Sequence, residues 1–426
     1  MEVLLDRKKA PKITEIPSIS ILDVKKETLN NGLNVLSLKQ ESFNTLKFEI
    51  SIPKRYDVST NYALGYLTTR MLQEGTESLT SEEISDKIAM NGAFFEVNYS
   101  NDSISLQLYC LQPFFKELLH LVYDILYRPS FPNAEFENLK SRYIQQFLTN
   151  IEKTSYLASI YSKQTLFGEG HPYTVNTAIS DIETIQLEMV KEYYQKAILE
   201  AKPVFYLTGE FGENEVNYIK DVFKQINFKE DQYSLATQEL NQFGERHIHK
   251  DNAVQNTIAI TAKSILKSHQ DYHKLVVTNE ILGGFFGSRL MKNIREDKGY
   301  TYGIYSRVIA LKYDAYFYIG TDLKPAFVAP CLEEIKKEIH ILRNEKVSSS
   351  ELDVLKNYLL GRFSSSLSSV YDHMKKRKTI HHLHLKDTFF SEYLDTIKKI
   401  DSSDIMDIAQ KYLDVDKFSI LNVGAA

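Results

Sequence analysis

The sequence of 426 residues contains only two cysteines, Cys110 and Cys331, which lie far apart between apolar neighbours. This pattern fits buried thiols and excludes a disulfide framework. No apolar run approaches the roughly 18 residues that a membrane-spanning helix requires, and MEVLLDRKKAPKI at the start contains no uninterrupted apolar stretch typical of a signal peptide. We therefore expect a cytoplasmic protein without a membrane span, or a periplasmic one if a signal peptide was removed.

An excess of basic charge is also missing. The formal net charge is −5, and acidic and basic residues are interspersed along the chain. This composition argues against a nucleic-acid partner. The hydrophobic fraction of 43% is ordinary for a globular protein, and the length exceeds that of one ordinary core, so the sequence predicts two or more domains.

A phosphate-binding loop is absent as well. The glycine-rich run 283–287, GGFFG, lacks the Lys-Ser/Thr pair of that motif, and it follows a helical pattern where the motif requires a strand. This run nevertheless opens the most informative stretch of the chain, LGGFFGSRLMKNIREDKGYTYGIYS at residues 282–306. The stretch continues as an amphipathic helix and changes at Gly299 into a strand of alternating aromatics, which places Arg295 near the helix end and Tyr302 seven residues later.

The sequence contains a long internal repeat. Gly299 follows Gly92 by 207 positions, and Glu351 follows Glu135 by 216, so the two offsets agree to within one loop insertion. A period this long indicates a duplicated domain, because solenoid repeats are about 20–50 residues long. We expect an N-terminal domain at residues 1–226, a polar linker at 227–256 and a C-terminal domain at 257–426.

Each half mixes helices and strands in runs. In the first half, strands are predicted at residues 33–39, 45–53, 93–99 and 103–110, and helices at 60–74, 81–91, 113–127 and 133–150. This order favours an α+β fold in each half, a mostly antiparallel sheet with helices on one face, over a doubly wound parallel sheet.

Several landmarks occur in a familiar order, namely Gly75-Thr76, His171-Pro172-Tyr173 and the motif G-S-R-L-x-x-x-I-R-E-x-K-G-Y-x-Y. With them the chain resembles the pitrilysin/insulinase peptidases, or inverted zincins, over most of residues 25–425. The resemblance implies two homologous domains of the mitochondrial processing peptidase type. In that family an H-x-x-E-H helix in the first half binds zinc through its two histidines, its glutamate activates water, and a later glutamate completes the ligand set.

The zinc motif itself is missing here. In the register fixed by Gly75-Thr76, its histidines become Tyr66 and Arg70 and its glutamate becomes Thr69. The third ligand should fall near residues 145–147, but no Asp or Glu occurs between Glu137 and Glu152. Tyrosine and arginine cannot replace two neutral imidazoles, and threonine is no general base at neutral pH. We therefore expect no metal in this chain and no hydrolysis by the chain alone.

Other histidines could suggest a rival metal site. His269 and His273 have i, i+4 spacing, but Tyr272 occupies the place of the glutamate and no third ligand is indicated. A second group of histidines contains His381, His382 and His384 together with His373. We expect these side chains to lie on a solvated polar face, with a fortuitous metal-binding patch as the alternative.

The resemblance gives roles to the second-half residues. Arg295 would donate to a peptide carbonyl and Tyr302 to the developing oxyanion, while Gly283, Gly284 and Gly287 stand where relatives carry a substrate-binding loop. From spacing alone, the arginine could instead complement the last helix carbonyls, and the tyrosine could pack half-buried in a strand.

These expectations combine into one functional hypothesis. The chain would be the noncatalytic, substrate-binding subunit of a heterodimeric zinc metalloendopeptidase that acts on unfolded peptides, with zinc held by a homologous partner that carries H-x-x-E-H. The alternative is a catalytically inert structural or peptide-binding protein of the same fold. Nothing in the sequence supports an enzyme that uses an unrelated site.

Overall fold

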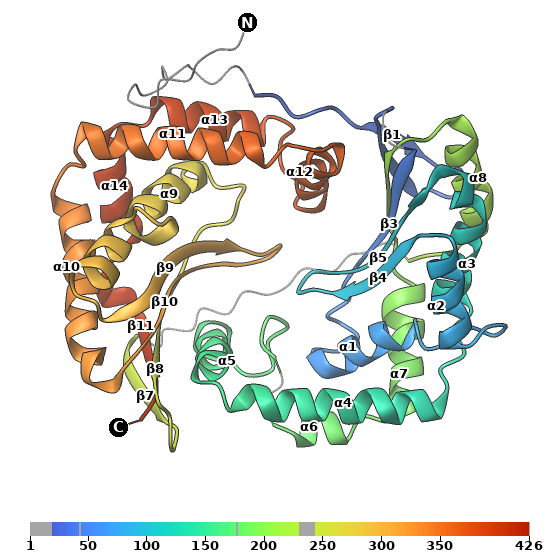
Figure 1. Cartoon of the computed structure of the whole chain (residues 1–426), viewed down its shortest axis with the longest axis horizontal. Coiled ribbons are helices and arrows are strands. Elements are labelled where there is room, and N and C mark those ends of the chain that lie inside the picture. The colour runs from blue at the N-terminus through green and yellow to red at the C-terminus, as the bar shows by residue number, and fades with distance from the viewer. Residues whose placement is uncertain (1–18, 42–43, 176–177, 230–242, 426) are drawn as a thin grey trace, which may run out of the picture.

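The computed structural model describes residues 19–41, 44–175, 178–229 and 243–425. The described chain forms two β-sheets that stand on opposite sides of the molecule (Figure 1). One sheet has six strands in the order β1-β2-β6-β3-β5-β4, and the other has five in the order β7-β11-β8-β10-β9.

The first half supplies the six-stranded sheet and eight α-helices among the described residues. Its strands are β1 (Lys25–Thr28), β2 (Asn34–Lys39), β3 (Thr45–Pro53), β4 (Phe94–Tyr99), β5 (Ser103–Leu111) and β6 (Val204–Gly209). Its helices are α1 (Tyr62–Met71), α2 (Ser81–Met90), α3 (Phe115–Tyr127), α4 (Asn133–Ile151), α5 (Thr154–Phe167), α6 (Ser180–Glu183), α7 (Leu187–Tyr193) and α8 (Glu213–Phe223). A π-helical turn, η2 (Tyr194–Leu199), continues α7.

The second half supplies the five-stranded sheet. Its strands are β7 (Gly244–His249), β8 (Asn256–Lys263), β9 (Thr301–Ala310), β10 (Ala315–Leu323) and β11 (Ser419–Gly424). Its helices are α9 (Tyr272–Asn279), α10 (Val328–Asn344), α11 (Ser349–Ser365), α12 (Val370–His382), α13 (Phe389–Lys399) and α14 (Ser402–Tyr412). Two π-helical turns, η3 (Glu280–Gly284) and η4 (Met291–Asp297), lie between α9 and β9.

The two sheets have the same topology. The order β2-β6-β3-β5-β4 in the first corresponds to β7-β11-β8-β10-β9 in the second, and each contains one parallel pair, β2 with β6 and β7 with β11. The other neighbouring strands pair antiparallel. The predicted α+β fold with two homologous, mostly antiparallel domains is therefore confirmed.

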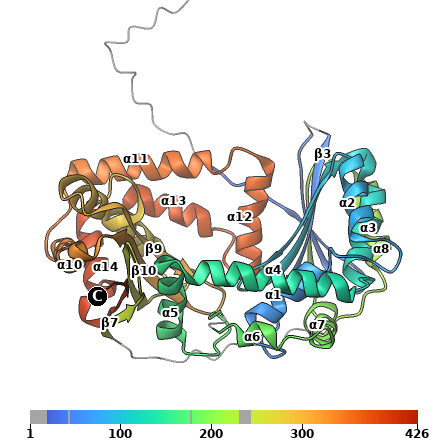
Figure 2. The same ribbon diagram turned by 60° about the horizontal axis from the view of Figure 1, so that its bottom comes forward.

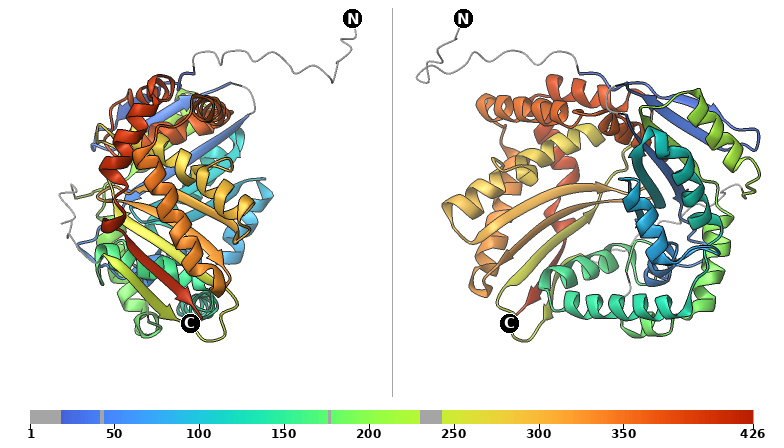
Figure 3. Two further views of the ribbon diagram at one scale, coloured as in Figure 1. Left: turned by 90° about the vertical axis from the view of Figure 1, so that its left-hand side faces the viewer. Right: turned by 45° about the vertical axis from the view of Figure 1, so that its right-hand side comes forward.

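Alternation along the strands determines which face each helix layer covers. In β3, Phe48 and Ile50 are fully buried in the core beneath the outer helices, while the intervening Glu49 faces the other side of the sheet. The second sheet is covered in the same way by α9, α10 and α14, which Figure 3 shows on its outer side.

Each half also supplies one helix to the opposite face of the other half's sheet. Helix α5 packs Ala158 against Ala259 and Leu421 of the second sheet, and α12 packs Val370 and Met374 against the first. Figures 1 and 2 show both helices between the sheets. The helices of each half pack on one face of their own sheet, as predicted, and the other half covers the opposite face with one helix, because apolar side chains such as Leu421 also occur at positions that face inward.

The segment between the halves only partly resembles a linker. Of the predicted linker 227–256, residues 230–242 lie outside the described residues. Gly244–His249 form β7, the outermost strand of the second sheet. In this edge strand Arg246 and His247 are exposed and most side chains are polar. Apolar alternation in the sequence therefore could not predict it.

Polar contacts join the two halves near the inner ends of the sheets. Asp102, in the β4–β5 turn, accepts hydrogen bonds from the Tyr173 hydroxyl at 2.7 Å and from the backbone N–H of Lys312, in the β9–β10 turn, at 3.1 Å. Lys378 of α12 forms an ion pair with the buried Glu49 of β3. Among the described residues, no helix is both long and apolar enough to cross a lipid bilayer.

Candidate functional site

Helix α1 carries the three positions that would form the zinc motif. The helix begins after Asn61, whose side chain accepts a hydrogen bond from the N–H of Leu64 at 3.0 Å. Thr69 is fully buried and donates its hydroxyl to the carbonyl of Gly65 at 2.8 Å. Its hydroxyl is thus engaged within the helix and is not directed at a substrate.

Aromatic contacts fill the space beside Tyr66. Its ring stacks on Tyr143 of α4, with centroids 4.7 Å apart and planes inclined by 26°. The guanidinium of Arg70 lies 5.5 Å from the centroid of the Tyr66 ring. The motif positions are therefore brought together in space, but they form a cation–aromatic stack in place of a ligand set.

Residues 145–147, the stretch predicted to hold the third ligand, contain no carboxylate. Tyr143 of α4 contacts Tyr66, and Phe147 is buried in the core at 4% exposure. Positions 143 and 147 lie about one turn apart on the same side of α4, and both carry aromatic rings in place of an acidic side chain. Across the described ranges, no group of three or more His, Cys, Asp or Glu side chains could hold a metal ion.

A buried lysine, Lys54, lies beside α1, and no motif or spacing in the sequence indicates it. The ammonium of Lys54 lies 4.2 Å from the ring centroid of Tyr99, 5.1 Å from that of Tyr56 and 5.6 Å from that of Tyr62. Lys54 is 5% exposed. Burial lowers the pKa of Lys54 to about 8, and the nearby Asp102 opposes this shift.

The pKa of Lys54 predicts a specific dependence of stability on pH. Between about pH 8 and pH 10.5 the unfolded chain binds a proton at Lys54 that the folded chain has lost. The free energy of unfolding of the wild type should therefore rise with pH relative to that of Lys54→Met, by up to about 3 kcal/mol across this window. Chemical denaturation of both proteins at intervals through the window measures the difference, and parallel pH profiles would contradict the prediction.

The second-half site lies at the free edge of the second sheet. Tyr302 belongs to the edge strand β9, where the register with β10 shifts between Thr321 and Leu323. The Thr301 hydroxyl donates to the carbonyl of Asp322 at 2.7 Å, and the Thr321 hydroxyl donates to that of Gly303 at 2.9 Å. Such irregularities redirect side chains at strand edges. Tyr302 is 93% exposed, so the half-buried packing role considered for it does not apply.

Arg295 lies directly beside Tyr302. Its Nε donates to the backbone carbonyl of Tyr302 at 3.0 Å, and its guanidinium lies 4.8 Å from the ring centroid of Phe286. Arg295 belongs to the π-helical turn η4, which differs from the α-helix expected there. Phe286 is 64% exposed, so the arginine, the tyrosine and this phenylalanine together form a solvent-facing surface.

The three glycines of the predicted substrate loop differ in environment. Gly283 is buried, and a Cβ there would lie 2.7 Å from the Ser306 hydroxyl of β9. Gly284 is half-buried, with the Glu280 carboxylate 2.7 Å from the corresponding position, and Gly287 is exposed. Close packing therefore explains the glycine at 283, and Gly287 is the one of the three that lies open to solvent.

An ion pair occupies the part of the second half that corresponds to α1. Helix α9 and the turn η3 hold the place in the second half that α1 holds in the first. There the buried Glu280 accepts two hydrogen bonds from Arg362 of α11, at 3.1 and 2.7 Å. Burial raises the pKa of Glu280, and the arginine opposes this shift. This pair joins two helices and provides no metal ligand set.

The remaining histidines are distributed among separate environments. His269 accepts a hydrogen bond from the N–H of Asp271 at 3.1 Å, while the ring centroid of His273 lies 4.4 Å from that of Phe389. His381 contacts the Tyr206 hydroxyl at 3.2 Å, and burial lowers the pKa of His382 to about 4. These rings pack against aromatic and polar neighbours, which corrects the expectation of a solvated polar face for the histidines of α12.

Comparison with protein families agrees with this architecture. Residues 35–166 match the model of the insulinase family, peptidase family M16, and residues 184–359 match that of the peptidase M16 inactive domain. The chain belongs to peptidase family M16.

Two of three similar proteins are described as a non-peptidase or as a probable inactive enzyme. The chain is 24% identical over 379 residues to the non-peptidase homolog YmxG of Helicobacter pylori, covering 85% of this chain and 84% of that protein. It is 22% identical over 373 residues to the probable inactive metalloprotease YmfF of Bacillus subtilis, covering 80% and 85%. An uncharacterized zinc protease YmxG of B. subtilis is 19% identical over 357 residues, covering 83% and 87%.

Solved structures share the fold. A peptidase M16 inactive domain from Pseudomonas fluorescens superimposes with a TM-score of 0.85 at 21% identity, covering 95% of this chain and 99% of that one. A protease from H. pylori gives a TM-score of 0.86 at 16% identity, covering 95% and 100%. With the zinc motif replaced at Tyr66, Thr69 and Arg70, the chain is a noncatalytic homologue within this family.

Proposed function

We propose that this chain is the noncatalytic, substrate-binding subunit of a heterodimeric zinc metalloendopeptidase that cleaves unfolded peptides. Its partner is a homologous chain that carries H-x-x-E-H and holds the zinc. One observation carries the proposal. Tyr302 is 93% exposed at an irregular strand edge beside Arg295, in a chain whose own α1 has no ligand set for zinc.

The two side chains suit two different steps of peptide hydrolysis. Arg295 retains guanidinium N–H groups beyond the Nε that binds the Tyr302 carbonyl, and these can donate to a peptide carbonyl. The Tyr302 hydroxyl can donate to the oxygen that gains negative charge when water attacks. The partner supplies the zinc-bound water and the glutamate that accepts its proton.

The arrangement of the second half supports this division of roles. Close packing of Gly283 on Ser306 fixes the turn η3 against β9, and the hydroxyls of Thr301 and Thr321 hold the irregular end of that strand. The backbone that carries Tyr302 is therefore held in place before a substrate binds. A fixed backbone limits the reorganisation that is needed to bring the hydroxyl to a developing oxyanion.

The alternative function is an inert structural or peptide-binding protein of the same fold. The descriptions of the H. pylori and B. subtilis relatives as non-peptidase and inactive favour it. The two functions differ in what a partner does to activity, because an inert binding protein gives no gain in peptide cleavage with any homologous chain.

Purification of the protein from its native source tests the proposal. We expect an H-x-x-E-H homologue to copurify in equal amount and the preparation to cleave unfolded peptides. If the protein purifies without such a homologue, the inert alternative is favoured. The same holds if the two chains form a stable complex that cleaves no unfolded peptide.

A further inference from the structure

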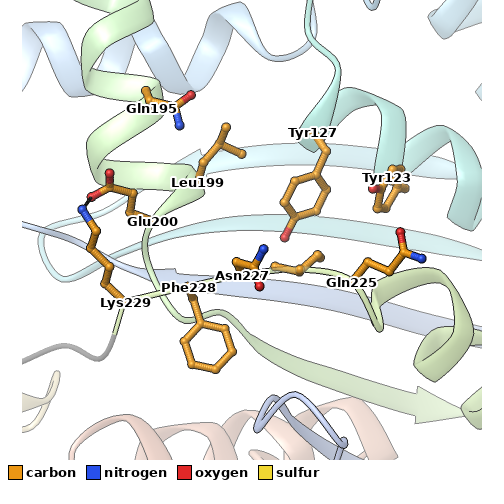
Figure 4. A pocket seen from close by; sticks show the side chains of 10 residues that line it. Tyr123, Tyr127, Gln195, Leu199, Glu200, Gln225, Asn227, Phe228 and Lys229 are labelled. Atoms are coloured by element: carbon orange, nitrogen blue, oxygen red, sulfur yellow. Dashed lines mark hydrogen bonds and ion pairs between the residues drawn. The ribbon is translucent and has the colours of Figure 1, made fainter.

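A pocket on the outer side of the first half has no part in the proposed peptidase function. It lies between the end of α3, the turn η2 and the segment that follows α8. Its volume is about 390 Å³, within the range of small-molecule sites. Figure 4 shows Tyr123 and Tyr127 on one side of it, Gln195 and Leu199 on another, and residues 225–229 along its base.

The pocket has an aromatic wall. The rings of Tyr123 and Tyr127 lie 4.9 Å apart and are inclined by 33°, and both pack against Phe223 beneath them. Phe228 contributes a third ring to the lining and is half-buried. The Lys202 ammonium lies over one face of the Phe228 ring, 4.8 Å from its centroid, so the two tyrosine rings of the lining are what favours a planar aromatic ligand over a branched aliphatic one.

Neutral polar groups surround this wall. Within the described part of the chain, neither the carboxamides of Gln195, Gln225 and Asn227 nor the hydroxyl of Tyr127 forms a hydrogen bond, and Figure 4 shows none between these groups. A carboxamide offers both a donor and an acceptor. Burial raises the pKa of Tyr127, so its hydroxyl keeps its proton at neutral pH.

The charges at the rim are paired. Glu200 forms an ion pair with Lys229 at 2.7 Å and a longer one with Arg55 at 3.5 Å. The pKa of Glu200 lies below its ordinary value, mainly because Lys229 donates a hydrogen bond to it. The carboxylate therefore stays ionised. A charged ligand would have to displace one of these partners, which favours an uncharged one.

From these features we propose that the pocket binds a small, uncharged heteroaromatic ring with donors and acceptors on its edge, of the purine-base type. The ring stacks on Tyr127, and the carboxamides of Gln195 and Asn227 bond its edge. The site lies on the helical side of the first sheet, across that sheet from β9, so the ligand and a peptide bound beside β9 would occupy separate surfaces.

The sequence contains no tryptophan, which permits a direct assay. In Phe228→Trp the single indole at the pocket should show saturable quenching by adenine, with a midpoint below about 1 mM. Adding Leu199→Phe, which fills the pocket, or Gln195→Ala should weaken binding at least about tenfold. As a control, Gln40→Ala changes an exposed glutamine outside the lining and should leave the affinity for adenine unchanged.

Saturation-transfer NMR on the unmodified full chain provides a measurement that needs no substitution. Adenine should receive saturation from the protein, while cyclohexanol and benzoate should not. Absence of an adenine signal overturns the proposal. An equal signal from benzoate overturns the preference for an uncharged ligand, and an equal signal from cyclohexanol overturns the preference for an aromatic one.

Discussion

Arg295→Ala and Tyr302→Phe should each reduce the rate of peptide cleavage by the reconstituted complex about a hundredfold or more, because each removes a donor aimed at the reacting peptide. Both side chains lie at the surface, and the tyrosine is 93% exposed. Changes at such positions usually alter the free energy of unfolding by less than about 0.5 kcal/mol. Thermal stability and partner binding should therefore remain close to those of the wild type, which steady-state kinetics and thermal melts will show.

The strand that carries Tyr302 offers matched controls. Tyr305 and Arg307 lie on the same strand, 3 and 5 residues farther along, and pack against each other with the guanidinium 4.8 Å from the ring centroid. Tyr305→Phe and Arg307→Ala should leave turnover within about threefold of the wild type. Full activity in Arg295→Ala and Tyr302→Phe would show that the pair has only a structural role and would favour the inert alternative.

Removal of metal should inactivate the complex but should have no effect on the isolated chain. A chelator should abolish peptide cleavage by the proposed complex, in which a zinc held by the partner would supply the nucleophilic water. The same treatment should leave the melting temperature of the isolated chain unchanged, since Tyr66 and Arg70, at the positions predicted for the two histidines of the zinc motif, stack with Tyr143 and offer no ligand set for zinc. Metal analysis of the isolated chain and activity assays before and after zinc is restored measure both effects.

One result would directly contradict this prediction. If chelator-free preparations of the isolated chain contain one tightly bound zinc, and if Tyr66→Phe or Tyr143→Phe releases it, the site on α1 is a metal site of a kind that its residues do not indicate. We expect instead a zinc content well below one per isolated chain.

Local patterns predicted much of the fold. The helix that carries the zinc-motif positions was predicted at residues 60–74 and is found at Tyr62–Met71, where Asn61 caps it. Strands β2 to β5 and helices α3 and α4 also lie close to their predicted ranges, because alternation and helical periodicity depend on neighbouring residues, whereas β1 and β6 were not predicted. The duplication was visible because its landmark glycines and glutamates keep their order.

The features that sequence reasoning missed depend on contacts between distant segments. The stacking of Tyr143 on Tyr66 joins α4 to α1, and the sequence pattern of neither helix alone predicts that contact. The three rings around Lys54 come from the end of β3, the start of α1 and the end of β4. The placement of α5 and α12 against the opposite sheets likewise follows from tertiary packing.

If this chain completes an active site that it cannot form alone, its addition must activate the partner. This can be measured as the initial rate of unfolded-peptide cleavage when purified chain is titrated into a fixed amount of its H-x-x-E-H partner. We expect negligible activity for either chain alone and a rise that saturates at one chain per partner. Unchanged partner activity at every ratio, or cleavage by this chain alone, would rule out this role.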